Sequence, residues 1–183
     1  QMKHIWFLLT AMTLSLSAAE ITVDEYKKIL AGKVTKTIQK EMLFFPMFEH
    51  GRVSIELSSP GQEVFKAVNN GTQKYIDGKY LLSIMKLPNG VTLTSILSWD
   101  EKLKAFCQWN LSPNGDLAYF LASKIKGDNT SLVWSGKFNK SGRLYQGTVT
   151  YSPEKINWEG QYFKDGKFLF REKGSVVKVG LQK

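Results

Sequence analysis

Few side chains in this 183-residue chain have the types and spacing that nucleophilic or metal chemistry requires. Cys107 is the only cysteine, and it falls in step with neighbouring apolar residues, which predicts a buried thiol rather than a reactive one. The two histidines are His4, within an expected leader, and His50. A hydrolase needs a base beside its nucleophile, and a histidine metal site needs several imidazoles. The sequence therefore disfavours both and indicates no metal and no cofactor.

The acidic residues that stand out belong to turn motifs. Asp100 is followed by Glu101, but neighbours in a strand or turn point in different directions, so the two do not form an acid and base pair. Asp and Asn side chains bond to the local backbone, and glycine accepts positive φ. We assign no catalytic residue and interpret these positions as turn formers: Asp77–Gly78, Asp100, Asn114–Gly115, Asp128 and Asp165–Gly166.

Aromatic side chains are the remaining candidates for a site. They are dense in LSWDEKLKAFCQWNLSPNGD, residues 97–116, and continue beyond it. Rings that converge on one interior either fill a core or wall a cavity for a small apolar or aromatic ligand, and both interpretations stay open. The candidate cavity residues are Trp99, Trp109, Tyr119, Trp134, Tyr145, Trp158 and Tyr162. Hydrogen bonds to such a ligand would come from Ser95, Ser123, Tyr119, Tyr145 or Tyr162.

Strands must position these rings, because short alternating runs separated by turn signals continue from Glu63 onward. At a period of two, one face is apolar and the other, with Gln108 and Asn110, is polar. We expect the apolar face to hold Leu93, Leu97, Trp99, Leu103, Ala105, Cys107, Trp109, Leu111, Leu117, Tyr119, Leu121, Ile125, Leu132, Trp134, Phe138, Tyr145, Val149, Tyr151, Ile156, Trp158, Tyr162, Phe168 and Phe170. The apolar exceptions on the polar face are Phe106, Phe120 and Phe163.

The regular run of hairpins predicts a closed sheet. About eight to ten strands joined by short turns, with no second helical layer, bury their apolar face by curling until the edges pair. We therefore expect an all-β, antiparallel up-and-down barrel of the lipocalin-like (calycin) type. Gly136, Gly147 and Gly160 fall on the inward face, where a missing side chain allows a strand to bend or makes room for a neighbouring ring.

One short helix is expected before the strands. In TVDEYKKILAGK, Thr22 is an N-cap with Glu25 three residues later, and Gly32 is a stop signal. Between residues 33 and 62 the signals are mixed. KVTKTIQ alternates like a strand, Pro46 interrupts the middle, and RVSIELS alternates again.

Residues 1–19 have the pattern of a secretory signal peptide. After Gln1, which we interpret as an artefact ahead of the natural start, the leader has a basic start, an apolar middle and small residues at Ser17 and Ala19. Its apolar stretch is shorter than the roughly 20 residues of a spanning helix, so we expect cleavage. Residues 20–183 are then one barrel domain, exported to the periplasm or secreted.

The net charge of the chain and its distribution limit the classes of partner that we expect. The chain has 25 Lys and Arg against 16 Asp and Glu, a net charge of +9. The lysines are spread along the chain rather than clustered with aromatics, and an exported protein seldom meets nucleic acid, so nucleic-acid binding is disfavoured. We expect a small hydrophobic molecule as the partner, and at most a weak contact with an anionic membrane or envelope surface.

Four short motifs carry a family resemblance. ILAGKVT, YIDGKYL, LSWDEKLKAFCQWNLSPNGD and LVWSGKF resemble successive landmarks of the uncharacterised bacterial calycin-like family catalogued as domain of unknown function 1579. The likeness covers most of residues 26–175, and the family's tryptophan after the first glycine is Lys33 here. It implies a closed lipocalin-like barrel with no established activity. The haem-binding relative nitrobindin uses a histidine inside its barrel, and no histidine falls on a strand expected here. The matching positions are Leu30, Gly32, Asp77, Gly78, Trp99, Asp100 and Gly115.

Three functions fit these observations, and an exported ligand-binding or structural module is favoured. A barrel enzyme, such as a dehydratase or isomerase, needs convergent polar groups inside the barrel, and the expected inward face has few. An outer-membrane barrel would turn the aromatic face toward lipid and needs an uncharged outer band about 25 Å tall.

Overall fold

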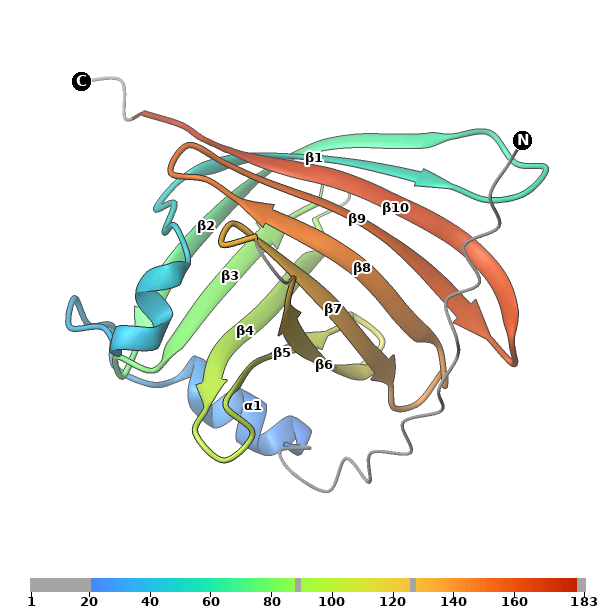
Figure 1. Ribbon diagram of the computed structural model, residues 1–183. Coiled ribbons are helices and arrows are strands. Elements are labelled where there is room, and N and C mark those ends of the chain that lie inside the picture. The colour runs from blue at the N-terminus through green and yellow to red at the C-terminus, as the bar shows by residue number, and fades with distance from the viewer. Residues whose placement is uncertain (1–20, 88–89, 126–127, 181–183) are drawn as a thin grey trace.

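The sheet closes into a barrel. The computed structural model describes residues 21–87, 90–125 and 128–180, so the expected signal peptide lies outside the described residues. Among them, ten antiparallel strands each pair with the next in sequence, and β1 pairs with β10 from Gly51↔Lys178 to Ser58↔Arg171 (Figure 1). The expected all-β, up-and-down lipocalin-like barrel is confirmed. The strands are β1 (Gly51–Ser58), β2 (Phe65–Ile76), β3 (Tyr80–Lys86), β4 (Thr92–Asp100), β5 (Ala105–Leu111), β6 (Leu117–Lys124), β7 (Ser131–Phe138), β8 (Leu144–Tyr151), β9 (Lys155–Lys164) and β10 (Lys167–Lys178).

Local hydrogen bonds explain why the chain turns where it does. Asp77 and Gly78 between β2 and β3 both have positive φ, of 50° and 70°, as a tight hairpin turn requires. Between β4 and β5, the Asp100 Oδ1 accepts hydrogen bonds from the backbone N–H groups of Lys102 and Leu103. The prediction that these aspartates form turns is confirmed.

The N-terminal helix α1 (Val23–Leu30) lies against the outside of the barrel wall near β4 and β5 (Figure 1). The Thr22 side chain accepts from the Glu25 backbone N–H, and the Glu25 carboxylate accepts from the Thr22 backbone N–H, so the predicted capping box is present. Tyr26 is fully buried, and its hydroxyl donates to Thr94 Oγ1 at 2.8 Å. No helix among residues 21–87, 90–125 and 128–180 is long and apolar enough to cross a membrane.

The inward and outward faces of β5 and β6 are the opposite of those expected from the sequence. Cys107, Trp109 and Tyr119 were expected inside, but they point outward and form a buried cluster with Tyr26 of α1. Phe106 and Phe120, expected on the polar face, point inward and join the interior cluster. The expectation was wrong because α1 covers the outer face of these strands: the alternation in β5 places Cys107 and Trp109 under α1 and the polar Gln108 and Asn110 inside the barrel.

Several other residues that were expected on the inner face lie elsewhere in the structure. Phe168 pairs with Phe163, and both lie on the outer face of the sheet. A register shift between Phe168 and Phe170 places Phe170 opposite Tyr162, on the inner face. Leu103 is an exposed residue of the β4–β5 turn. Leu117 packs in the outer cluster under α1, together with Leu111 and Leu121 at its margin.

A 3-10 helix, η1 (Lys40–Phe44), closes one end of the barrel. Met42 and Phe45 are buried in the interior cluster, and the Phe45 ring lies 4.7 Å from that of Phe106 and 5.0 Å from that of Tyr151. The Tyr75 hydroxyl of β2 donates to the Met42 carbonyl at 3.2 Å, which holds η1 to the barrel wall. The closed end of the barrel, its floor, is therefore made by η1 and the residues after it.

Residues 33–62, where the sequence signals are mixed, contain one strand and one 3-10 helix. RVSIELS forms most of β1. KVTKTIQ forms no strand and contributes only an isolated bridge between Val34 and Ile76. Its alternation did not predict pairing, because η1 begins directly after it and turns the chain into the end of the barrel.

The packing of α1 on the outer wall predicts the effect of removing its anchor. Tyr26→Ala should lower the free energy of unfolding by about 3 kcal/mol, because a fully buried ring is lost. Tyr26→Phe should cost about 1 kcal/mol, the typical value of one hydrogen bond. Urea unfolding of both variants measures this, and a Tyr26→Ala protein as stable as the parent would contradict the placement of α1.

Candidate functional site

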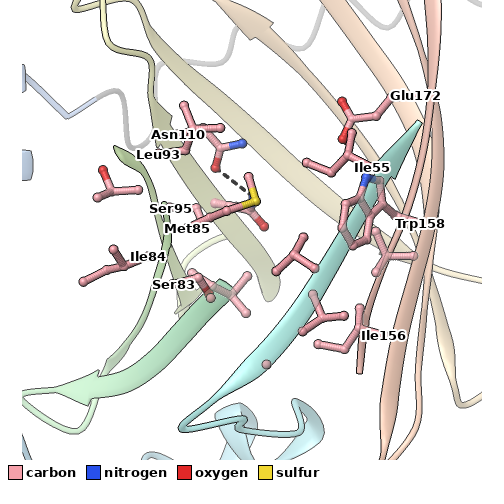
Figure 2. A pocket seen from close by; sticks show the side chains of 18 of the residues that line it. Ile55, Ser83, Ile84, Met85, Leu93, Ser95, Asn110, Ile156, Trp158 and Glu172 are labelled. Atoms are coloured by element: carbon pink, nitrogen blue, oxygen red, sulfur yellow. Dashed lines mark hydrogen bonds between the residues drawn. The ribbon is translucent and has the colours of Figure 1, made fainter. Parts of the chain in front are cut away.

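The barrel interior contains a cavity of about 920 Å³. Its walls come from inward-facing residues of all ten strands, and Phe45 and Phe48 from the η1 region lie at its closed end. It reaches Leu57, Phe65 and Leu87 at the opposite strand ends, where the barrel is open. Most of the lining is aliphatic or aromatic. Figure 2 shows side chains from opposite walls, such as Ser95 and Trp158, facing each other across this space.

The interior stays hollow because large rings lie flat on neighbouring strands. A Cβ on Gly160 would lie 2.3 Å from the Tyr145 ring, and one on Gly147 would lie 2.3 Å from the Tyr145 hydroxyl. A Cβ on Gly174 would lie 2.1 Å from the Trp158 ring. The absence of a Cβ therefore lets these rings cover the wall instead of projecting to the axis. The predicted role of interior glycines in making room for rings is confirmed here.

Four of the seven candidate aromatics line the cavity: Trp134, Tyr145, Trp158 and Tyr162. They come from β7, β8 and β9, so one side of the barrel supplies them all. Trp99 also faces inward but packs against Phe106 with a ring separation of 4.9 Å, outside the cavity lining. Trp109 and Tyr119 lie on the outer face under α1, which corrects their assignment to the cavity. The ligand-binding role of the other rings stays a prediction.

Among the predicted hydrogen-bonding residues, Ser95 lines the cavity with Tyr145 and Tyr162, whereas Ser123 is exposed outside the lining. Other polar residues also face the interior, among them Gln108 and Asn110, which were expected on the polar outer face. Gln73 Nε2 donates to Ser83 Oγ at 3.0 Å, and Gln108 Nε2 donates to Asn110 Oδ1 at 2.8 Å. These side chains form a polar patch on the β2–β5 wall of an otherwise apolar cavity.

Glu172 presents a carboxyl group to the cavity from the wall opposite the polar patch. The Trp158 indole N–H donates to one of its oxygens at 2.6 Å, and the Tyr162 hydroxyl donates to the other at 2.8 Å. Burial raises the pKa of Tyr162 well above its usual value, and the nearby Glu172 raises it further. Sequence reasoning missed Glu172 because the inward face was followed only as far as Phe170. The alternation Phe170, Glu172, Gly174 was the signal that could have found it.

At the open end, Asp116 joins two loops. The side chain is fully buried, and its oxygens accept from the backbone N–H groups of Lys140 at 2.8 Å and Ser141 at 3.2 Å. Burial alone would raise the pKa of Asp116, but the hydrogen bonds from Ser141 and Lys140 and the charge of Arg143 outweigh it and lower the pKa. The carboxylate therefore fixes the β7–β8 turn, from which Arg143 reaches the cavity mouth.

The described part of the chain contains no group of three or more His, Cys, Asp and Glu side chains that could hold a metal ion. Cys107 is buried on the outer face, and burial raises the pKa of its thiol to about 12. At neutral pH such a thiol is protonated and is a poor nucleophile or metal ligand. The prediction of a buried thiol is confirmed.

The ring that lies over Gly174 gives a test of the hollow interior. Gly174→Ala should lower the free energy of unfolding by about 1–3 kcal/mol and change the near-ultraviolet circular dichroism, because the new Cβ displaces the Trp158 ring. Gly180→Ala is the matched control, since a Cβ there meets nothing within 4 Å. Equal stability and equal spectra for the two variants would contradict the flat placement of the ring.

Comparison of the sequence with protein-family models and with curated proteins finds no match. Comparison of the fold with solved structures finds barrels. One, described as a redesigned beta barrel (b11L5F_LGL), is 8% identical with a TM-score of 0.38, covering 79% of this chain and 100% of that one. Another, described as EF1p2_mFAP2b bound to DFHBI, is 11% identical with a TM-score of 0.36, covering 75% of this chain and 95% of that one.

Proposed function

We propose that this protein binds a small apolar or aromatic molecule inside its barrel. The observation that carries the proposal is the cavity of about 920 Å³, open at one end and closed at the other by η1. Small-molecule sites are typically clefts of roughly 300–1,000 Å³, lined mainly by apolar and aromatic side chains with a few polar groups. The cavity has this size and this composition.

The residues of the barrel walls favour ligand binding over an enzyme and over an outer-membrane barrel. An acid and base pair would need two titratable groups in reach of one substrate, and Glu172 is the one carboxyl group among the described residues that line the cavity. On the outer wall, Glu159, Arg171 and Lys173 form exposed ion pairs across β9 and β10. A lipid-facing band is apolar, so this charged wall disfavours an outer-membrane barrel.

Ligand titration tests the proposal. We expect a saturable change in tryptophan fluorescence with at least one of decanoic acid, haem and the neutral dye Nile red, because Trp134 and Trp158 line the cavity. Ser95→Phe should weaken that binding roughly tenfold or more, since the added ring fills cavity volume.

Ser135→Phe is the matched control, because Ser135 is an exposed strand residue on the outer face of β7. It should bind as the parent does. A flat response to all three compounds, or equal loss of binding in both variants, would overturn the proposal.

We also propose that the chain is exported, as its N-terminal pattern predicts, and that it belongs with the calycin-like family it resembles. The positive net charge of +9 supports weak attraction to anionic envelope surfaces. Expression of the full chain in a bacterium should yield periplasmic protein whose first residue, measured by mass spectrometry, is near Glu20. Cytoplasmic protein that retains residues 2–19 would contradict export.

A further inference from the structure

The cavity contains an acidic group without a cationic partner. Of the charged side chains that line it, Lys66 pairs with Glu56 at 3.2 Å. Arg143 lies 4.5 Å from the centre of the Phe138 ring and interacts electrostatically with both Asp116 and Tyr162. Glu172 differs from both. Within the described residues, no Lys or Arg nitrogen lies within 4.0 Å of its oxygens, and its hydrogen-bond donors are the neutral Trp158 and Tyr162.

The two donors hold the carboxyl group in one orientation. Each oxygen accepts one hydrogen bond, and an indole N–H can only donate, so the group is fixed as a double acceptor with further acceptor capacity. Trp158 is itself held against the wall by the space at Gly174. In Figure 2 the Glu172 side chain lies beside Trp158 and faces the cavity. The site is therefore built before any ligand arrives.

Aromatic rings surround this carboxyl group. Tyr162 stacks on Phe170 at 4.2 Å between ring centres, and Tyr145 lies 5.0 Å from Tyr162. With Trp158, these rings line the cavity beside the acidic Glu172. An ammonium group is attracted by both features, and the attraction to a ring face grows when water is excluded.

We propose that the cavity selects cationic amphiphiles, with an ammonium group at Glu172 and an apolar body in the rest of the barrel. The inference rests on the proposed binding function and names its ligand class. The chemical class is a primary or quaternary amine that carries an alkyl or aryl group. Val53, Ile55 and Val176 provide the apolar wall below Glu172 for that group.

A charge series of equal chain length tests the selection. Isothermal titration calorimetry would compare decyltrimethylammonium, 1-decanol and decanoate, each below its micelle-forming concentration, with the full chain. We expect the cation to bind roughly tenfold or more tightly than decanol and decanoate. Binding of decanol or decanoate as tight as that of the cation would overturn the inference but leave the binding function standing. No heat of binding with any of the three would overturn both.

Two variants locate the charge effect. Glu172→Gln keeps the size of the side chain but removes its charge, so affinity for decyltrimethylammonium should fall roughly tenfold while affinity for decanol stays unchanged. Glu159→Gln removes an exposed acid from the outer face of β9 and should leave both affinities as they are. Unchanged affinity of Glu172→Gln for the cation would overturn the inference. The comparison within the parent protein does not depend on the folding of either variant.

Discussion

Side chains on the inner face of a small barrel point toward its axis, so aromatic residues there collide unless something keeps them at the wall. In this protein the inner face places glycine where a neighbouring ring must lie: Gly147 and Gly160 accept Tyr145, and Gly174 accepts Trp158. A methyl group at any of these positions would overlap a ring atom, and the ring would have to move toward the centre. The hollow interior therefore depends on close contact between backbone and ring.

This constraint connects the fold to the site. Because the Trp158 ring is held at the wall, its N–H reaches Glu172, which also accepts from Tyr162. Phe45 packs against Phe106 at the closed end of the barrel, and Asp116 fixes the β7–β8 turn at the open end. An apolar chamber with one fixed carboxyl group suits the ligand class that we propose, molecules that combine an apolar body with positive charge.

The fold could be predicted from local signals because turns and alternation are read over a few residues. Thr22 and Glu25 marked the helix, and Asp77–Gly78 marked a hairpin, as the structure confirms. The faces of β5 and β6 could not be predicted, since α1 buries the apolar outer face of this strand pair while the inner face carries the polar Gln108 and Asn110 beside Phe106. The floor was missed because η1 has little periodicity of its own. Glu172 was missed because the inward face was followed only as far as Phe170, although the alternation continues through Glu172 to Gly174.

A crystal structure of the full chain would show whether the interior of the barrel is hollow. We predict a closed ten-stranded barrel with an interior space near 920 Å³, bounded by the Trp134, Tyr145 and Trp158 rings lying along the wall. Rings that meet at the axis and leave no space for a ligand, or that point out from an open sheet, would contradict it.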